Sequence, residues 1–388
     1  MIYGRLKRWV RHRRRLAGGC RLAWLGAGLL SSAVWAEVLP LPPEGMDLVG
    51  EVRHVRARYE DTLIDIARAY SLGQDEIVMA NPTVDRWLPG AGTKVLVPHQ
   101  FILPNAPRTG IVVNIPEMRL YYYLSAGKGQ KPTKLVTYPI SIGRMDWRTP
   151  LGVTRVVAKV KDPVWRPPPS IKAEHAKEGD FLPDVVPPGP NNPLGQFAMR
   201  LGVPGYLIHG TGLDKAYGIG MRVTHGCIRM YPEDIAKLFP EVPVGTPVNL
   251  VNQPVKLGRK DGRLYIEVSQ PLDEDRVGYE ELLAKATALI EKHTAGRPVV
   301  IDQAAVVRAV RQPTGIPTVI GAPPGMMVET DEAPPVTPTV APSAAADADT
   351  LPDAWKPASP TGDVMPSGGM ETRPAFEPAE RPTLEAVF

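Results

Sequence analysis

The two terminal segments of this 388-residue chain have compositions that do not suit a packed core. We therefore expect the folded part to lie between them. Residues 1–36 carry eight Lys or Arg residues and no acid. The last 67 residues, from Ala322 onward, hold thirteen of the 44 prolines and eleven acids against three bases. A segment of this composition buries too little apolar area to order itself, so we expect residues 322–388 to form a disordered tail.

The basic start predicts an export signal. An apolar stretch follows the charged residues and ends at Val34-Trp35-Ala36, where small side chains at the −3 and −1 positions suit signal peptidase. We therefore expect cleavage after Ala36, a linker over 37–51 and a periplasmic protein. An uncleaved membrane anchor is the alternative, but the apolar stretch is short of the roughly 20 residues that a spanning helix needs.

The charge of the middle of the chain argues against one class of partner. The formal net charge is +4, and +8 on the leader and −8 on the tail leave about +4 for everything between them. A nucleic-acid-binding protein should carry its excess basic charge on its folded part, so we exclude that class.

Residues 52–98 have the pattern of a small α+β module with the order strand, two helices, strand. Asp61-Thr62 offers a cap for the first helix, in which apolar side chains recur at helical spacing. Asn81-Pro82 would end the second helix, and a short strand closes at Pro98.

The longest patterned region is mainly β. Alternating and apolar runs over 110–251 predict an antiparallel β-sandwich or barrel with few helices. Pro163–Pro190 is rich in proline and polar residues, and we expect it to be a surface insertion near a binding cleft. An accessory segment over 255–320 combines a strand at Leu264–Val268 with helices at Tyr279–Lys292 and Val299–Val310.

The chemistry of the chain is concentrated around one cysteine. Cys20 would leave with the export signal, so Cys227 cannot form a disulfide within the mature chain. His209 and His225 lie within the same nineteen residues. A histidine can take the thiol proton and stabilise the thiolate, and backbone N–H groups around Gly226 can stabilise an oxyanion.

Two other readings of this segment compete with nucleophilic catalysis. His209, His225 and Cys227 could ligate zinc, but no second CxxC or HxxxH element accompanies them. A glycine-rich loop whose polar residues only cap turns is the other reading. We favour the nucleophile and expect no metal and no cofactor.

The order His209, fourteen residues, Thr224, then His225-Gly226-Cys227 resembles the signature of L,D-transpeptidases with a YkuD-type catalytic domain. Arg229, two residues after the cysteine, is similar to the ErfK branch of that family. The resemblance covers about 50–251. Its first part resembles a LysM module that binds N-acetylglucosamine-containing glycans, although Glu60 stands where glycine is usual in such modules. In the catalytic signature, Thr224 stands where serine is commoner.

The resemblance implies a role for each site residue. Cys227 would be the nucleophile, His209 the proton acceptor and donor, and His225 an orienting or polarising group. Gly226 would help form the oxyanion hole. Arg229 would bind a substrate carboxylate unless it forms a structural salt bridge, and Thr224 would bind substrate unless it only caps a turn.

The implied substrate is peptidoglycan. Attack on the third residue of a tetrapeptide stem would release D-Ala. The acyl group would pass to an amine of another stem, giving a 3–3 cross-link, or to a lysine of an envelope lipoprotein. Transfer to water would make the protein a carboxypeptidase.

Two further classes remain as alternatives. One is a non-enzymatic peptidoglycan-binding envelope protein, and the other is a cysteine peptidase of the NlpC type, in which the nucleophile usually precedes its histidine. We also expect the module at 52–98 to bind the cell wall without contributing to the chemistry, so that a chain starting near Phe101 would stay active.

Overall fold

The computed structural model describes residues 38–125, 127 and 129–326. The chain divides into two units, 1–33 and 34–388, and every described residue belongs to the second. The expected export signal lies outside the described residues, as does the expected tail beyond residue 326. Within the described part, no helix has the length and apolar character needed to cross a membrane.

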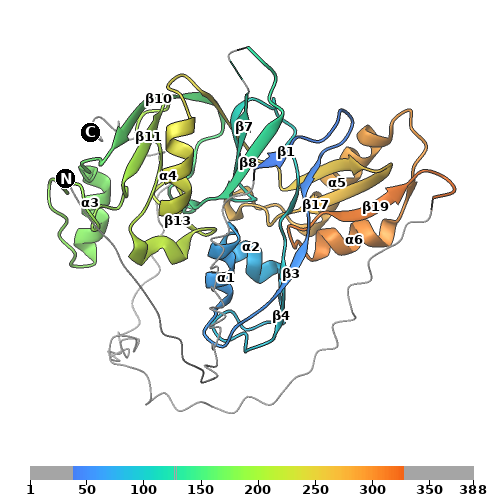
Figure 1. Cartoon of the computed structure of the whole chain (residues 1–388), viewed down its shortest axis with the longest axis horizontal. Helices are drawn as coiled ribbons and strands as arrows, with labels where there is room; N and C mark the ends of the chain where they lie inside the picture. Colours follow the sequence, from blue (N-terminus) through green and yellow to red (C-terminus); the bar gives the residue numbers. More distant parts are fainter. Residues whose placement is uncertain (1–37, 126, 128, 327–388) are drawn as a thin grey trace, which may run out of the picture. The chain divides into compact units, whose positions relative to one another are not determined.

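A nine-stranded sheet forms the centre of the fold (Figure 1), so the mainly β prediction with few helices is confirmed. Its strands run in the order β1 (Leu39–Pro40), β8 (Lys134–Pro139), β7 (Arg119–Leu124), β6 (Gly110–Asn114), β15 (Pro247–Val251), β10 (Gly152–Lys161), β11 (Phe197–Leu201), β12 (Leu207–His209) and β14 (Ile228–Arg229).

The sequence predicts an antiparallel sheet, but the observed sheet also contains parallel pairs. The pairs β6–β15 and β12–β14 are parallel. A parallel pair cannot be joined by a tight hairpin and needs a crossover connection. Between β12 and β14 that crossover is residues 210–227, and it contains most of the expected site.

Helix α4 (Pro232–Glu241) anchors the chain shortly after β14, the strand that ends this crossover. It begins with proline at its first position and has acids in its first turn, both of which favour a helix start. Ile235 and Leu238 are buried in the core beneath the sheet. Burial of one such side chain contributes about 1.5–3 kcal/mol, so α4 fixes the end of the crossover.

The segment from residue 48 to residue 102 forms two strand pairs and two short helices. Strands β2 (Leu48–Gly50) and β5 (Gln100–Ile102) pair with each other, as do β3 (Arg53–Arg56) and β4 (Lys94–Val97). Helices α1 (Leu63–Ala69) and α2 (Gln74–Ala80) lie between β3 and β4 in the chain. The predicted cap at Thr62 is present as a capping box, with Thr62 Oγ1 accepting from Asp65 N at 3.1 Å and Asp65 accepting from Thr62 N at 3.0 Å.

This α+β module, which the structure describes in full, does not have a hydrophobic core of its own. Leu63, Ile66 and Ile77 of the module share one apolar core with Tyr121 and Leu135 of the nine-stranded sheet. The structure therefore argues against the expectation that the module can be removed without effect on the catalytic part.

The turn between α1 and α2, with the helix ends that border it, contacts both the crossover and the segment that follows β14. Before β13 (Arg222–Thr224), Ile219 O accepts a 2.8 Å hydrogen bond from Gln74 N. After β14, Tyr231 Oη donates to Leu72 O at 3.3 Å. An ion pair of 2.7 Å joins Arg68 Nε to Glu233 Oε1 in the first turn of α4.

The C-terminal segment has a core of its own. Its sheet runs in the order β16 (Val255–Lys260), β17 (Arg263–Val268), β19 (Thr318–Ala322), β18 (Val300–Ile301), and α5 (Tyr279–Thr294) and α6 (Gln303–Arg311) pack on it. Val299 does not begin a helix as predicted, since β18 precedes α6, whose N-cap is Asp302. Ala322 is fully buried at the end of β19 and so belongs to the folded part.

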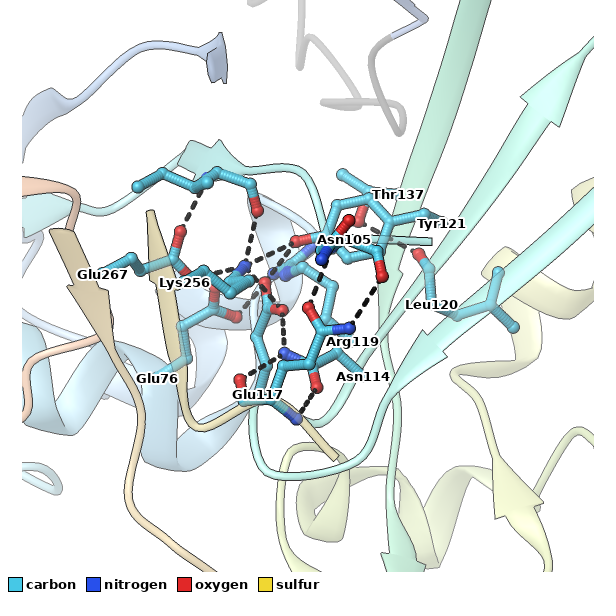
Figure 2. A network of polar contacts seen from close by, with 12 residues as sticks. Glu76, Asn105, Asn114, Glu117, Arg119, Leu120, Tyr121, Thr137, Lys256 and Glu267 are labelled. Atoms are coloured by element: carbon cyan, nitrogen blue, oxygen red, sulfur yellow. Dashed lines mark hydrogen bonds and ion pairs between the residues drawn. The ribbon is translucent and has the colours of Figure 1, made fainter. Parts of the chain in front are cut away.

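A buried group of charges joins these three regions (Figure 2). Arg119 of β7 lies 2.5 Å from Glu76 of α2. Lys256 of β16 lies 2.8 Å from Glu117 and 2.7 Å from Glu267 of β17. Arg119, Lys256 and Glu267 are almost completely withdrawn from solvent, and burial raises the pKa of Glu267. We call these five side chains the junction network.

Candidate active site

The crossover brings together residues that the sequence separates. His209 is the last residue of β12, Cys227 directly precedes β14, and the two strands pair in parallel with His209 opposite Arg229. A cavity of about 90 Å³ is lined by His209, Cys227, Thr224, His225 and Arg229. Of the six residues expected to form the site, these five therefore face one space, and Gly226 lies in the loop between them.

Cys227 is half-buried and lines the cavity. Sγ lies 3.7 Å from the carbonyl oxygen of Gly205, near the limit for a weak thiol hydrogen bond. Burial disfavours the thiolate and raises the pKa of Cys227 to about 11. The resting sulfur is therefore a thiol at neutral pH.

His209 is buried and its tautomer is set by its neighbour. Nδ1 lies 2.6 Å from the carbonyl oxygen of Gly210. A carbonyl only accepts, so Nδ1 carries the proton and Nε2 keeps its lone pair. Burial, and next the charge of Arg229, lower the pKa of His209 to about 3, which makes the ring neutral.

The turn before the cysteine requires glycine. Gly226 has φ +99°, and a Cβ there would lie 2.8 Å from Tyr206 Cε1. Gly226 N donates to Thr224 Oγ1 at 3.2 Å, and Thr224 Oγ1 donates to Cys227 O at 2.7 Å. The hydroxyl of Thr224 thus holds the turn that presents Cys227, which is the capping alternative stated above.

His225 lies among residues that come from distant parts of the chain. Its Nε2 lies 3.1 Å from Glu174 Oε2, and its ring meets Trp147 edge to face at 5.1 Å between centroids. Burial lowers the pKa of His225, whereas the charge of Glu174 acts in the opposite direction. Glu174 also pairs with Arg144, which follows β9 (Ile142–Gly143).

Sequence reasoning did not select Glu174. The only available signal was the placement of the Pro163–Pro190 insertion near a cleft, and this insertion does line the cavity with Trp165, Pro168 and Ile171. The segment also forms helix α3 (Pro169–Lys177), which the sequence analysis did not predict. Nothing in the local pattern distinguished Glu174 from the neighbouring acids.

No cluster of three or more His, Cys, Asp or Glu side chains that would hold a metal ion occurs among residues 38–125, 127 and 129–326. The cavity is lined by a thiol, a neutral imidazole, a second imidazole beside a carboxylate, and the guanidinium of Arg229.

These features place a thiol, two imidazoles and a guanidinium in one cavity on a β scaffold, and comparison with known proteins gives the family of the chain. The family model for the L,D-transpeptidase catalytic domain, YkuD, matches residues 108–250. The probable L,D-transpeptidase YcfS of Escherichia coli K12 is 42% identical over 280 residues, which are 71% of this chain and 82% of the relative. This chain belongs to the L,D-transpeptidase family and is an enzyme.

Two further relatives from the same strain agree. The probable L,D-transpeptidase ErfK/SrfK is 43% identical over 265 residues, covering 67% of this chain and 82% of the relative. The probable L,D-transpeptidase YbiS is 39% identical over 301 residues, covering 76% and 95%.

Proposed function

We propose that this protein is an exported, periplasmic L,D-transpeptidase that remodels peptidoglycan, with Cys227 as its nucleophile and His209 as its acid–base group. One observation carries the proposal. His209, with an accepting Nε2, ends one of two neighbouring parallel strands, Cys227 directly precedes the other, and both residues line one cavity. A thiol and a neutral imidazole in such a place are the two groups that acyl transfer needs.

The uncharged resting pair sets the order of events. As Sγ attacks the carbonyl of the third stem residue, its proton passes to Nε2 of His209. The tetrahedral intermediate collapses, the bond to the terminal D-Ala breaks, and His209 returns the proton to the leaving amine. A thioester remains on Cys227. An incoming amine gives its proton to His209 while it displaces the thiolate, and His209 then returns that proton to the sulfur.

The remaining residues have supporting roles in this proposal. Thr224 and Gly226 shape the turn that presents Cys227, and an N–H of that turn would bind the oxyanion. Arg229 lines the cavity and would contribute a positive charge to the binding of a substrate carboxylate. His225 lines the same cavity, where it would orient the wall beside Cys227.

The acceptor amine belongs either to another stem, which gives a 3–3 cross-link, or to a lysine of an envelope lipoprotein. The βααβ module of residues 52–98 is proposed to be a LysM module that binds the glycan strands. Its capped α1 and its βααβ order support that assignment.

The test uses the chain from Glu37 onward and a disaccharide-tetrapeptide. We expect loss of D-Ala and a cross-linked dimer by mass spectrometry, and one covalent adduct per chain after treatment with a carbapenem. Cys227→Ala should abolish all three products. His209→Ala should slow them about 10²–10⁴-fold, the usual loss on removal of an acid–base group.

Two results would contradict the proposal. If the wild type bound sacculi but converted no stem peptide, the non-enzymatic binding protein would be favoured. If an adduct persisted in Cys227→Ala, the nucleophile would be a different residue.

A further inference from the structure

Helix α3 lies against the cavity without a core of its own. None of its nine residues, all of which the structure describes, is fully buried. Ile171 on this helix and Pro168 before it line the cavity beside Cys227. A helix that buries so little must be held by specific contacts, since isolated helices of this length are not stable in water.

Glu174 supplies contacts that reach out of the insertion. Its Oε2 lies 3.1 Å from His225 Nε2, and its Oε1 accepts from Arg144. The other acid–base contacts of the helix, Lys172 with Asp184 and His175 with Asp180, stay within the insertion. Glu174 therefore ties α3 both to the turn that carries the catalytic cysteine and to the segment after β9.

The same contact determines which nitrogen of His225 carries the proton. An ionised carboxylate only accepts, so Nε2 of His225 must be the donor. The hydrogen bond from Arg144 lowers the pKa of Glu174 and keeps it ionised. The charged and titratable groups that face the His225 ring are Glu174 and His175 from α3 and Arg144 from the β9 side.

We infer that Glu174 is a positioning residue for the transpeptidase reaction: it holds His225 with its proton on Nε2 and fixes α3 as one wall of the substrate cavity. This inference rests on the proposed function, because it assigns a purpose to the wall beside Cys227. Glu174 acts on Cys227 indirectly, by positioning His225 and by shaping the cavity. It takes no part in the proton transfer of His209.

The first test reads the histidine directly. Ring nitrogens of the mature chain are labelled with ¹⁵N, and the His225 signals are identified by their loss in His225→Gln. We expect the wild type to show the Nε2–H tautomer. Glu174→Gln removes the carboxylate, so we expect loss of that fixed tautomer and a His225 titration midpoint at lower pH, because Glu174 raises the pKa of His225 against burial.

The second test reads turnover of the disaccharide-tetrapeptide. Because the side chains are nearly the same size, Glu174→Gln should leave cavity volume intact while reducing kcat about 10- to 100-fold, the order of loss that misplacement of a reacting group produces. Glu174→Asp keeps the charge and should recover part of kcat. The matched control is Glu178→Gln, the same chemical change at an exposed position directly after α3.

The outcomes separate this inference from the proposed function. An inactive wild type would contradict the proposed function, while the tautomer measurement would still test the contact. An active wild type with unchanged tautomer or unchanged kcat in Glu174→Gln would overturn the inference. If Glu174→Gln does not fold, Glu174→Asp and Arg144→Gln are measured instead, and wild-type values of both readouts in these two variants would overturn it.

Discussion

At the scale of single residues, burial acts on Cys227 and His209 in opposite directions. It raises the pKa of the thiol to about 11 and lowers the pKa of the imidazole to about 3. Each shift disfavours a charged form, so the two groups face the cavity as a neutral pair rather than as a thiolate and an imidazolium. In the proposed mechanism the proton therefore moves from Cys227 to His209 during the attack.

This state predicts the reactivity of the free enzyme. Alkylation of Cys227 by iodoacetamide should accelerate about tenfold per pH unit between pH 6 and 9.5, because the reactive thiolate is scarce throughout that range. The rate is measured by intact-protein mass, with Cys227→Ala as the blank. A rate that levels off near pH 7 would instead indicate a preformed thiolate–imidazolium pair.

The sequence could predict that Cys227, His225 and Thr224 lie together, because the motif that contains them is short and continuous. Cys227, His225 and Thr224 lie within four positions, and a turn with Gly226 at φ +99° presents them together. Glu174 could not be found in the same way. It lies 51 positions from its partner His225, and its contact depends on where the insertion packs.

At the scale of elements, the turn between α1 and α2 lies against the catalytic crossover. Gly73, the N-cap of α2, approaches Gly220 so closely that a Cβ on Gly73 would lie 2.7 Å from Gly220 Cα. Gly220 is two residues from β13, the strand that leads into His225. The glycine pair thus sets the distance between the module and the catalytic loop.

Substitution Gly73→Ala should push these two segments apart. We expect a loss of about 1–3 kcal/mol in the free energy of unfolding, as for other overpacked contacts, together with a lower kcat at temperatures well below melting. Gly278→Ala is the matched control, because Gly278 is also an N-cap and a Cβ there meets nothing within 4 Å.

Thermal melting and steady-state turnover of both variants provide the measurement. If Gly73→Ala lowered only the melting temperature and kcat matched that of Gly278→Ala, the module would support the fold but not the geometry of the loop.

The elements themselves could be predicted better than their packing. The cap at Thr62 and the proline start of α4 are local signals and appear in the structure as expected. The strands were recognised from apolar runs, but the parallel pairs were missed because pairing direction depends on how distant segments meet. The shared core of module and sheet was missed for the same reason.

At the scale of the whole molecule, the junction network makes three regions interdependent. Glu76 comes from the module, Arg119 and Glu117 from the nine-stranded sheet region, and Lys256 and Glu267 from the C-terminal segment. A buried charge is tolerated only beside a partner of opposite charge, so each region supplies a charged side chain that pairs with one from another region.

Removal of the central base should show this dependence. Lys256→Met leaves Glu117 and Glu267 buried without their cation, and we expect a loss of about 3–5 kcal/mol in urea unfolding followed by circular dichroism. Adding Glu267→Gln should restore part of it. Lys285→Met breaks the exposed pair with Glu281 and should cost less than about 1 kcal/mol. Equal losses for the two lysines would refute the role given to the network.

The junction network also limits how a lineage of such proteins can change. An acid lost from one region leaves a base in another without its partner, so we expect a tolerated replacement at Glu76 to be accompanied by one at Arg119, and a replacement at Glu117 by one at Lys256. Recombination that exchanged one region for that of a distant cousin would bring mismatched charges together. We therefore expect the three regions to change together, and their boundaries to be poor places to splice a chimera.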